Sequence, residues 1–83
     1  MRFRSALGAL PEHVQERARA AFRQFQQDPH HPSLRFKQVH AARPIFSARV
    51  GLGYRALAIR DDQVYIWFWI GTHSDYDKLL KLR

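Results

Sequence analysis

An uninterrupted apolar segment, Val64–Ile70, constrains the fold of this chain more than any other feature. It is far shorter than the roughly 20 residues that a membrane-spanning helix needs. Its residues are apolar on both alternating faces, which predicts a central strand covered from both sides. Asp61–Asp62 marks a turn before the strand, and Gly71 is expected to end it. Trp67 and Trp69 are expected in the core, although indole rings can also stack on bases.

The first part of the chain carries a helical pattern. Apolar residues recur every three or four positions over residues 10–25, and this spacing predicts a helix with one apolar stripe. Pro11 suits the first turn of that helix, and Asp28 precedes a proline, so the helix is expected to end there. Phe3 and Leu7 continue the spacing upstream, which predicts a short preceding helix.

Three segments read as strands joined by short turns. They are Arg43–Val50, Tyr54–Arg60 and Gln63–Ile70, with a fourth extended piece at Leu34–Val39. Ser74 is placed to cap a last helix whose first turn carries acids. Helices segregated against a small antiparallel sheet define an α+β fold. We therefore expect one domain over residues 1–83, with a two-layer architecture in which an N-terminal helical hairpin packs on a small twisted sheet and a C-terminal helix follows.

The charge of the chain is concentrated in its middle. Fourteen Lys and Arg residues against seven Asp and Glu residues give a net charge of +7 over 83 residues. Residues 29–60 hold six of the basic residues and no acid, so this segment alone carries +6. Such a surplus predicts a polyanionic partner, namely nucleic acid, an acidic protein or an anionic membrane. The alternative is a surface that is merely basic.

The chain lacks the features of an exported or disulfide-bonded protein. It has no cysteine, and charged residues interrupt its first 20 residues where a secretory signal is apolar. A cytoplasmic protein that does not enter a membrane is therefore expected. His30 and His31 are adjacent in a polar connector with no acid or cysteine nearby, so no metal site is expected.

Three side chains are candidates for chemistry. Strand alternation puts Arg49 on the face of Ser47, and Arg55 lies where the next strand leaves a turn, so both guanidinium groups could bind a phosphate. His73 lies between a strand and a helix, where an imidazole can transfer protons. The alternatives are solvated edge arginines and a structural or capping histidine.

Five short segments follow one another along the chain in a recognisable order. They are Leu-Pro at 10–11, Pro-His-His-Pro-Ser-Leu-Arg-Phe-Lys at 29–37, Phe-Ser-Ala-Arg-Val at 46–50, Tyr-Arg-Ala-Leu at 54–57 and Trp-Phe-Trp-Ile-Gly-Thr-His-Ser-Asp-Tyr at 67–76. This succession resembles the RelE/ParE superfamily, the small basic toxins of bacterial type II toxin–antitoxin modules. The resemblance spans nearly the whole chain and implies the same hairpin-on-sheet fold. The family's usual N-terminal strand is expected to be missing or vestigial here.

The resemblance also implies roles for individual residues. Arg55 matches the arginine of the family's Tyr-Arg strand start, which contacts the scissile phosphate, and Arg49 matches a basic residue one strand earlier. His73 and Tyr76 fall where the family places its C-terminal catalytic residues. Three further basic residues are candidates for binding RNA or phosphate: Arg35, Lys37 and Arg43.

The function that the resemblance implies is cleavage of mRNA on the ribosome, without a metal ion or other cofactor, which inhibits translation. The expected partners are the ribosome, mRNA and a cognate acidic antitoxin. Some relatives use a glutamate on the sheet as general base, but residues 29–60 contain none, so the base is unassigned or is His73 or Lys37. Two alternatives stay open: a ParE-like inhibitor of DNA gyrase, and a relative without toxicity that only binds its antitoxin.

Overall fold

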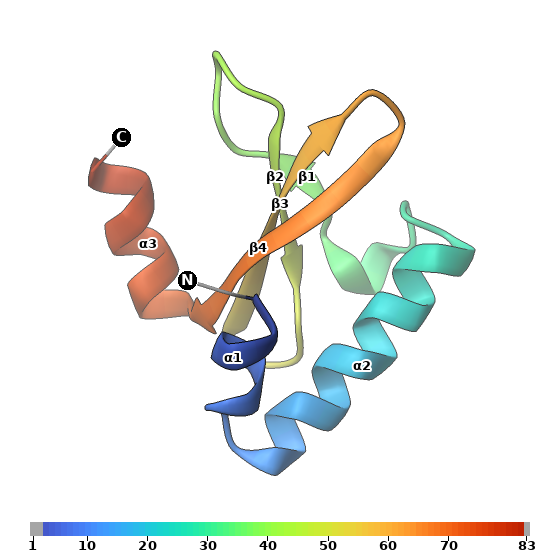
Figure 1. Cartoon of the computed structure of the whole chain (residues 1–83), viewed down its shortest axis with the longest axis vertical. Coiled ribbons are helices and arrows are strands. Elements are labelled where there is room, and N and C mark those ends of the chain that lie inside the picture. Colours follow the sequence, from blue (N-terminus) through green and yellow to red (C-terminus); the bar gives the residue numbers. More distant parts are fainter. Residues whose placement is uncertain (1–2, 83) are drawn as a thin grey trace.

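The computed structural model describes residues 3–82, which form three α-helices and four strands (Figure 1). The helices are α1 (Phe3–Gly8), α2 (Glu12–Gln27) and α3 (His73–Leu82), and a 3-10 turn, η1, spans Pro32–Leu34. The strands are β1 (Lys37–Gln38), β2 (Ile45–Arg49), β3 (Tyr54–Asp61) and β4 (Val64–Thr72). The predicted order of two helices, a run of strands and a last helix is confirmed.

Helix α2 begins and ends where the sequence signals predict. Pro11 occupies its N-cap position, and Asp28 follows its last residue in an extended conformation, as a residue before proline prefers. Val14, Ala18 and Phe25 are the buried residues of the predicted apolar stripe. The stripe fixes which side of α2 faces the rest of the protein.

The strands form one antiparallel sheet in the order β1-β2-β3-β4, so each strand pairs with the next along the chain. Helices α1 and α2 lie along one face of the sheet, while α3 lies on the other side of the strands (Figure 1). The architecture is the predicted α+β fold, with an N-terminal helical hairpin on a small antiparallel sheet. No helix within residues 3–82 is both long and apolar enough to cross a membrane.

The hydrophobic core lies between α1, α2 and the sheet. Ala18, Val50, Ala56 and Ile70 form its buried centre. Aromatic rings close the space between α2 and the sheet, and the rings involved are those of Phe22, Phe25, Phe36, Tyr65 and Trp67. These large rings fill the space between α2 and the sheet, whereas α1 lies close to β4. Trp67 is therefore a core residue, as predicted.

The prediction that Val64–Ile70 forms a central strand was wrong. β4 lies at the edge of the described sheet, and Val64, Ile66 and Phe68 are 61%, 48% and 38% exposed. The layer formed by α1 and α2 covers only the face that carries Trp67. Val64 and Ile66 lie on the opposite face, which this layer does not reach, so apolar character on both faces does not mean burial on both.

The predicted end of this strand at Gly71 was also wrong. β4 continues to Thr72, and Gly71 pairs in register with Arg55. A glycine is required here because the indole of Trp69 lies over it: a Cβ at this position would be 2.7 Å from the ring. Trp69 thus packs on the face opposite α2, where it is half-buried.

Two other boundaries differ from the prediction. Helix α3 begins at His73, and Thr72 rather than Ser74 caps it, because the Thr72 hydroxyl accepts the N–H of Asp75 at 3.1 Å. Within the extended piece predicted at 34–39, only β1 is a strand, since η1 occupies its start.

Candidate active site

Strands β2 and β3 bring two arginines side by side. Arg49 and Arg55 are register partners across the antiparallel pair, on either side of a tight turn. Side chains of register partners point to the same face of a sheet. The turn depends on Gly51 and Gly53, whose φ angles of 77° and 82° are conformations that glycine adopts readily.

The Arg55 guanidinium is held rigidly below the surface. Arg55 is 6% exposed, and its Nη2 donates to the hydroxyl of Ser47 at 3.1 Å. Its Nε is buried without a hydrogen-bond partner in the part of the chain that the structure describes. A buried cation with an unsatisfied donor costs stability, and an anion bound beside this guanidinium would offset that cost.

Tyr76 supports this arginine from α3. Its ring centroid lies 5.2 Å from the guanidinium carbon of Arg55, and its hydroxyl donates to the same Ser47 hydroxyl at 3.2 Å. Tyr76 is only 4% exposed, so its ring has no free face for a base. Its place in the structure is that of a residue that positions Arg55.

His73 is the exposed member of the site. Its Nδ1 lies 3.2 Å from a carboxylate oxygen of Asp77, and about half of each side chain is accessible. Its ring meets that of Tyr76 edge-on at 5.6 Å between centroids. The backbone N–H of His73 donates to the Gly53 carbonyl at 2.8 Å, which ties the start of α3 to the β2–β3 turn.

Both arginines of the strand pair and His73 line one cavity. It has a volume of about 300 Å³ and is lined by Arg35, Arg49, Arg55 and His73, together with Tyr54 and the two turn glycines. Arg35 reaches it from the residue after η1, where the backbone is left-handed with φ 44°. Three of the four predicted catalytic residues therefore line one cavity, and one predicted phosphate-binding residue joins them. No Asp or Glu side chain lines it.

The other two predicted phosphate-binding residues do not line this cavity. Lys37 is exposed and pairs in register with Ser47, so it lies on the same face of the sheet but farther from the turn. Arg43 is exposed in the loop before β2, at the end of that strand away from Arg49.

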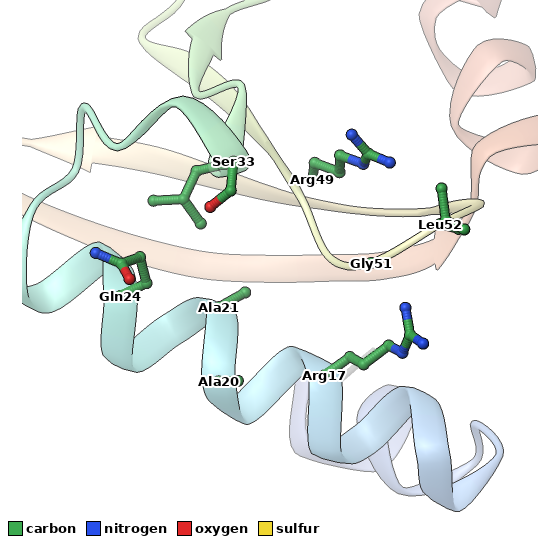
Figure 2. Close-up of a pocket in the computed structure, with 9 residues that line it drawn as sticks. Arg17, Ala20, Ala21, Gln24, Ser33, Arg49, Gly51 and Leu52 are labelled. Carbon is green, nitrogen blue, oxygen red and sulfur yellow. The ribbon is translucent and has the colours of Figure 1, made fainter.

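A second cavity adjoins the first one beside α2 (Figure 2). Its volume is about 480 Å³, and it shares Arg49 and Gly51 with the first cavity. Arg17 lines it from α2. Arg17 and Tyr54 were not predicted as site residues, because the helical pattern indicates only that Arg17 is not on the apolar stripe.

Unbalanced positive charge characterises both cavities. Within residues 3–82, the one hydrogen-bonding contact between a basic and an acidic side chain is that of His73 with Asp77. Among the same residues, no group of three or more His, Asp or Glu side chains is placed to hold a metal ion. The arrangement can bind an anion through guanidinium groups and can transfer a proton through one imidazole.

Comparison with known families fits this arrangement. A family model described as the ParE-like toxin domain matches residues 12–78, which include α2, the whole sheet and the first part of α3. The chain belongs to this family. A comparison with curated proteins gives no match.

A solved structure has the same fold as this ParE-like toxin domain. One chain in the crystal structure of the RelB–RelE antitoxin–toxin complex from Methanococcus jannaschii superposes with a TM-score of 0.71 at 20% sequence identity. The match covers 92% of this chain and 91% of that chain. The predicted membership of the RelE/ParE superfamily and the predicted RelE-like fold are confirmed.

Proposed function

We propose that this ParE-like domain is the toxin of a type II toxin–antitoxin module and that it cleaves mRNA on the ribosome, without a metal ion, to inhibit translation. The observation that carries this proposal is the convergence of Arg49, Arg55 and His73 on one cavity without acids. A purely structural role would not require three such groups to face the same space.

The proposed reaction uses the RNA's own 2′-hydroxyl. The 2′-oxygen attacks the neighbouring phosphorus and its proton passes to a general base, while the 5′-oxygen leaves and takes a proton from solvent. Negative charge grows on the phosphoryl oxygens during this step. Arg49 and Arg55 lie where they can stabilise that charge, a type of contribution that is often the largest in an enzyme.

His73 is the group that we assign as general base. Its Nδ1 faces the Asp77 carboxylate, so in the tautomer that donates to Asp77 its Nε2 is free to accept a proton. Lys37, the alternative base, does not line the cavity. Tyr76 acts indirectly, by holding Arg55 through its ring and through Ser47.

The antitoxin is the second partner in this proposal. An acidic protein complements the net charge of +7, most of which lies in residues 29–60. The matching solved structure is a complex of a toxin with its antitoxin. A ribosome and an mRNA complete the proposed set of partners, in the cytoplasm.

A cell-free translation reaction tests the proposal. The protein is added, and mRNA ends are mapped by primer extension; cuts at fixed positions within codons are expected. Arg55→Ala should lower the cleavage rate by about 100- to 1,000-fold and His73→Ala by about 100- to 10,000-fold. Arg19→Ala, an exposed change of the same charge on α2, is the matched control and should cleave normally.

Other outcomes would identify the alternatives. Intact mRNA together with inhibited supercoiling by DNA gyrase would favour a gyrase inhibitor, which needs no catalytic set. Intact mRNA and active gyrase, with the antitoxin still bound, would indicate a relative that has lost toxicity. Cleavage that persists in both Arg55→Ala and His73→Ala would contradict the residue assignment.

A further inference from the structure

The cavity beside α2 has no role in the proposed reaction, yet it opens beside the site of that reaction. The two cavities meet at Arg49 and Gly51, which line both of them. A polymer with one phosphate at Arg55 can therefore continue past Arg49 into the second cavity. We propose, building on the proposed function, that this second cavity binds the nucleotide next to the cleaved phosphodiester and that Arg17 binds its phosphate.

The position of Arg17 supports this assignment. Its side chain lies along the β2–β3 turn, because a Cβ at Gly51 would be 2.8 Å from Arg17 Cδ and 3.5 Å from Arg17 Nη1. Figure 2 shows Arg17 and Arg49 on either side of the turn that carries Gly51 and Leu52. Neither guanidinium has a carboxylate partner within residues 3–82. Two guanidinium groups that line one cavity can both donate charge-assisted hydrogen bonds to a phosphate.

The walls of the cavity suit a nucleotide base. Ala20 and Ala21 on α2 and the buried Leu34 after the connector give it apolar surface. Gln24 and Ser33 add an amide and a hydroxyl, which can hydrogen-bond to the edge of a base. Single-stranded RNA is commonly recognised in this way, with phosphates on cations and unstacked bases in pockets that read their edges.

The volumes of the two cavities agree with a phosphate in the smaller cavity and a nucleotide base in the larger one. The cavity at His73 is about 300 Å³, whereas the one at Arg17 is about 480 Å³. The smaller cavity is lined mainly by cations and glycines, which suits a phosphate group. The larger has the apolar walls that a base requires. An acidic peptide could bind the arginines, but its acidic side chains would not account for the apolar walls of the larger cavity.

An NMR titration of the full ¹⁵N-labelled chain tests the proposal, since weak binding is detectable in this way. The two probes are inorganic phosphate and trinucleotides of 2′-O-methyl RNA, in which the methyl group blocks attack by the 2′-oxygen. Phosphate, which has no base to fill the second cavity, should shift resonances near Arg55 and His73 most strongly. The trinucleotides should also shift the Gly51 amide and the side-chain amide of Gln24.

Two variants locate the second phosphate contact. Arg17→Ala should raise the trinucleotide Kd by about tenfold, the effect of losing one charge-assisted contact, and should leave phosphate binding unchanged. It should also lower the salt dependence of trinucleotide binding by about one unit of slope. Arg19→Ala removes the same charge from another side of α2 and should match the wild type, while Arg17→Lys should recover part of the affinity.

Three results would overturn the proposal. The first is equal loss of affinity in Arg17→Ala and Arg19→Ala, which would show a general effect of charge. The second is an absence of shifts at Gly51 and Gln24. The third is stronger displacement of these resonances by an oligoglutamate peptide than by the trinucleotides, which would assign the cavity to an acidic protein. Failure of the wild type to cleave mRNA, with trinucleotide binding as described, would instead refute the proposed function alone.

Discussion

The ring of Tyr76 lies 5.2 Å from the guanidinium carbon of Arg55, and both side chains hydrogen-bond to one serine hydroxyl. That hydroxyl, on Ser47, is fully buried. The Arg55 guanidinium is therefore held by two neutral groups, the Ser47 hydroxyl on β2 and the Tyr76 ring on α3, and not by a carboxylate. A neutral support keeps the full positive charge available to an anion in the cavity.

Replacing this serine tests the support. Ser47→Ala removes the acceptor of both hydrogen bonds and leaves two more buried donors without partners, so unfolding should become easier by about 1–3 kcal/mol. Urea denaturation measures the change. Ser5→Ala, at an exposed position in α1, is the control and should stay within about 0.5 kcal/mol of the wild type. If Ser47→Ala and Ser5→Ala are equally stable, the hydrogen bonds to Ser47 do not stabilise the protein.

Asp77 is predicted to orient His73 rather than to serve the helix dipole alone. Asp77→Asn removes the charge that faces Nδ1, so mRNA cleavage should fall by about 10- to 100-fold, less than the roughly 100- to 10,000-fold expected for loss of the imidazole itself. Asp75→Asn is the matched control, because it removes an acid from the first turn of the same helix and leaves the hydrogen-bond partner of the imidazole in place. Both variants should unfold at the same temperature. A similar loss of cleavage in both would show that the helix dipole, not the contact, is responsible.

The sequence predicted the convergence of the candidate site residues better than it predicted the edge of the sheet. Strand parity alone places Arg49 and Arg55 at one turn, because register in a hairpin follows from the turn and the alternation of side chains. His73 reaches the same turn because it follows Thr72, the register partner of Tyr54 in the β3–β4 pair. The register shift in that pair between Leu57 and Ala58 was not predicted from the sequence.

The features that the sequence did not predict depend on contacts between distant segments. Arg17 reaches the cavity only because α2 packs across the sheet beside Gly51, and a helical repeat carries no such information. The exposure of Ile66 depends on how many helices cover the sheet. The pattern of apolar residues along a strand indicates which side chains can be buried. Whether they are buried depends on which face of the sheet is covered by helices.

Alanine substitutions at the two turn glycines, Gly51 and Gly53, distinguish the effect of backbone strain from that of steric contact. Both have positive φ, so Gly51→Ala and Gly53→Ala should each cost about 1 kcal/mol or more in stability. A Cβ at Gly53 meets nothing within 4 Å, whereas one at Gly51 displaces Arg17. Only Gly51→Ala should therefore also weaken trinucleotide binding in the NMR titration. Equal binding by the two variants would show that Arg17 does not depend on this turn.

The cap of α3 gives a prediction in which the sequence and the structure disagree. Thr72→Ala should destabilise the protein by about 1 kcal/mol, because the N–H of Asp75 loses its acceptor. Ser74→Ala should change stability by no more than about 0.5 kcal/mol. Thermal unfolding followed by circular dichroism compares them. A larger loss of stability in Ser74→Ala than in Thr72→Ala would show that Ser74 is the cap, as the sequence predicts.

The two faces of β4 can be compared with a pair of identical substitutions. Ile70 is 4% exposed and belongs to the core centre, whereas Ile66 is 48% exposed on the opposite face. Ile70→Ala should cost about 2–5 kcal/mol, since it removes buried methyl groups and leaves a cavity against Ala18 and Ala56. Ile66→Ala should cost about 1 kcal/mol or less, because water already reaches much of that side chain. Urea denaturation of both variants under one condition measures the difference. Equal losses would mean that both faces of β4 are covered in solution, as its apolar sequence first suggests.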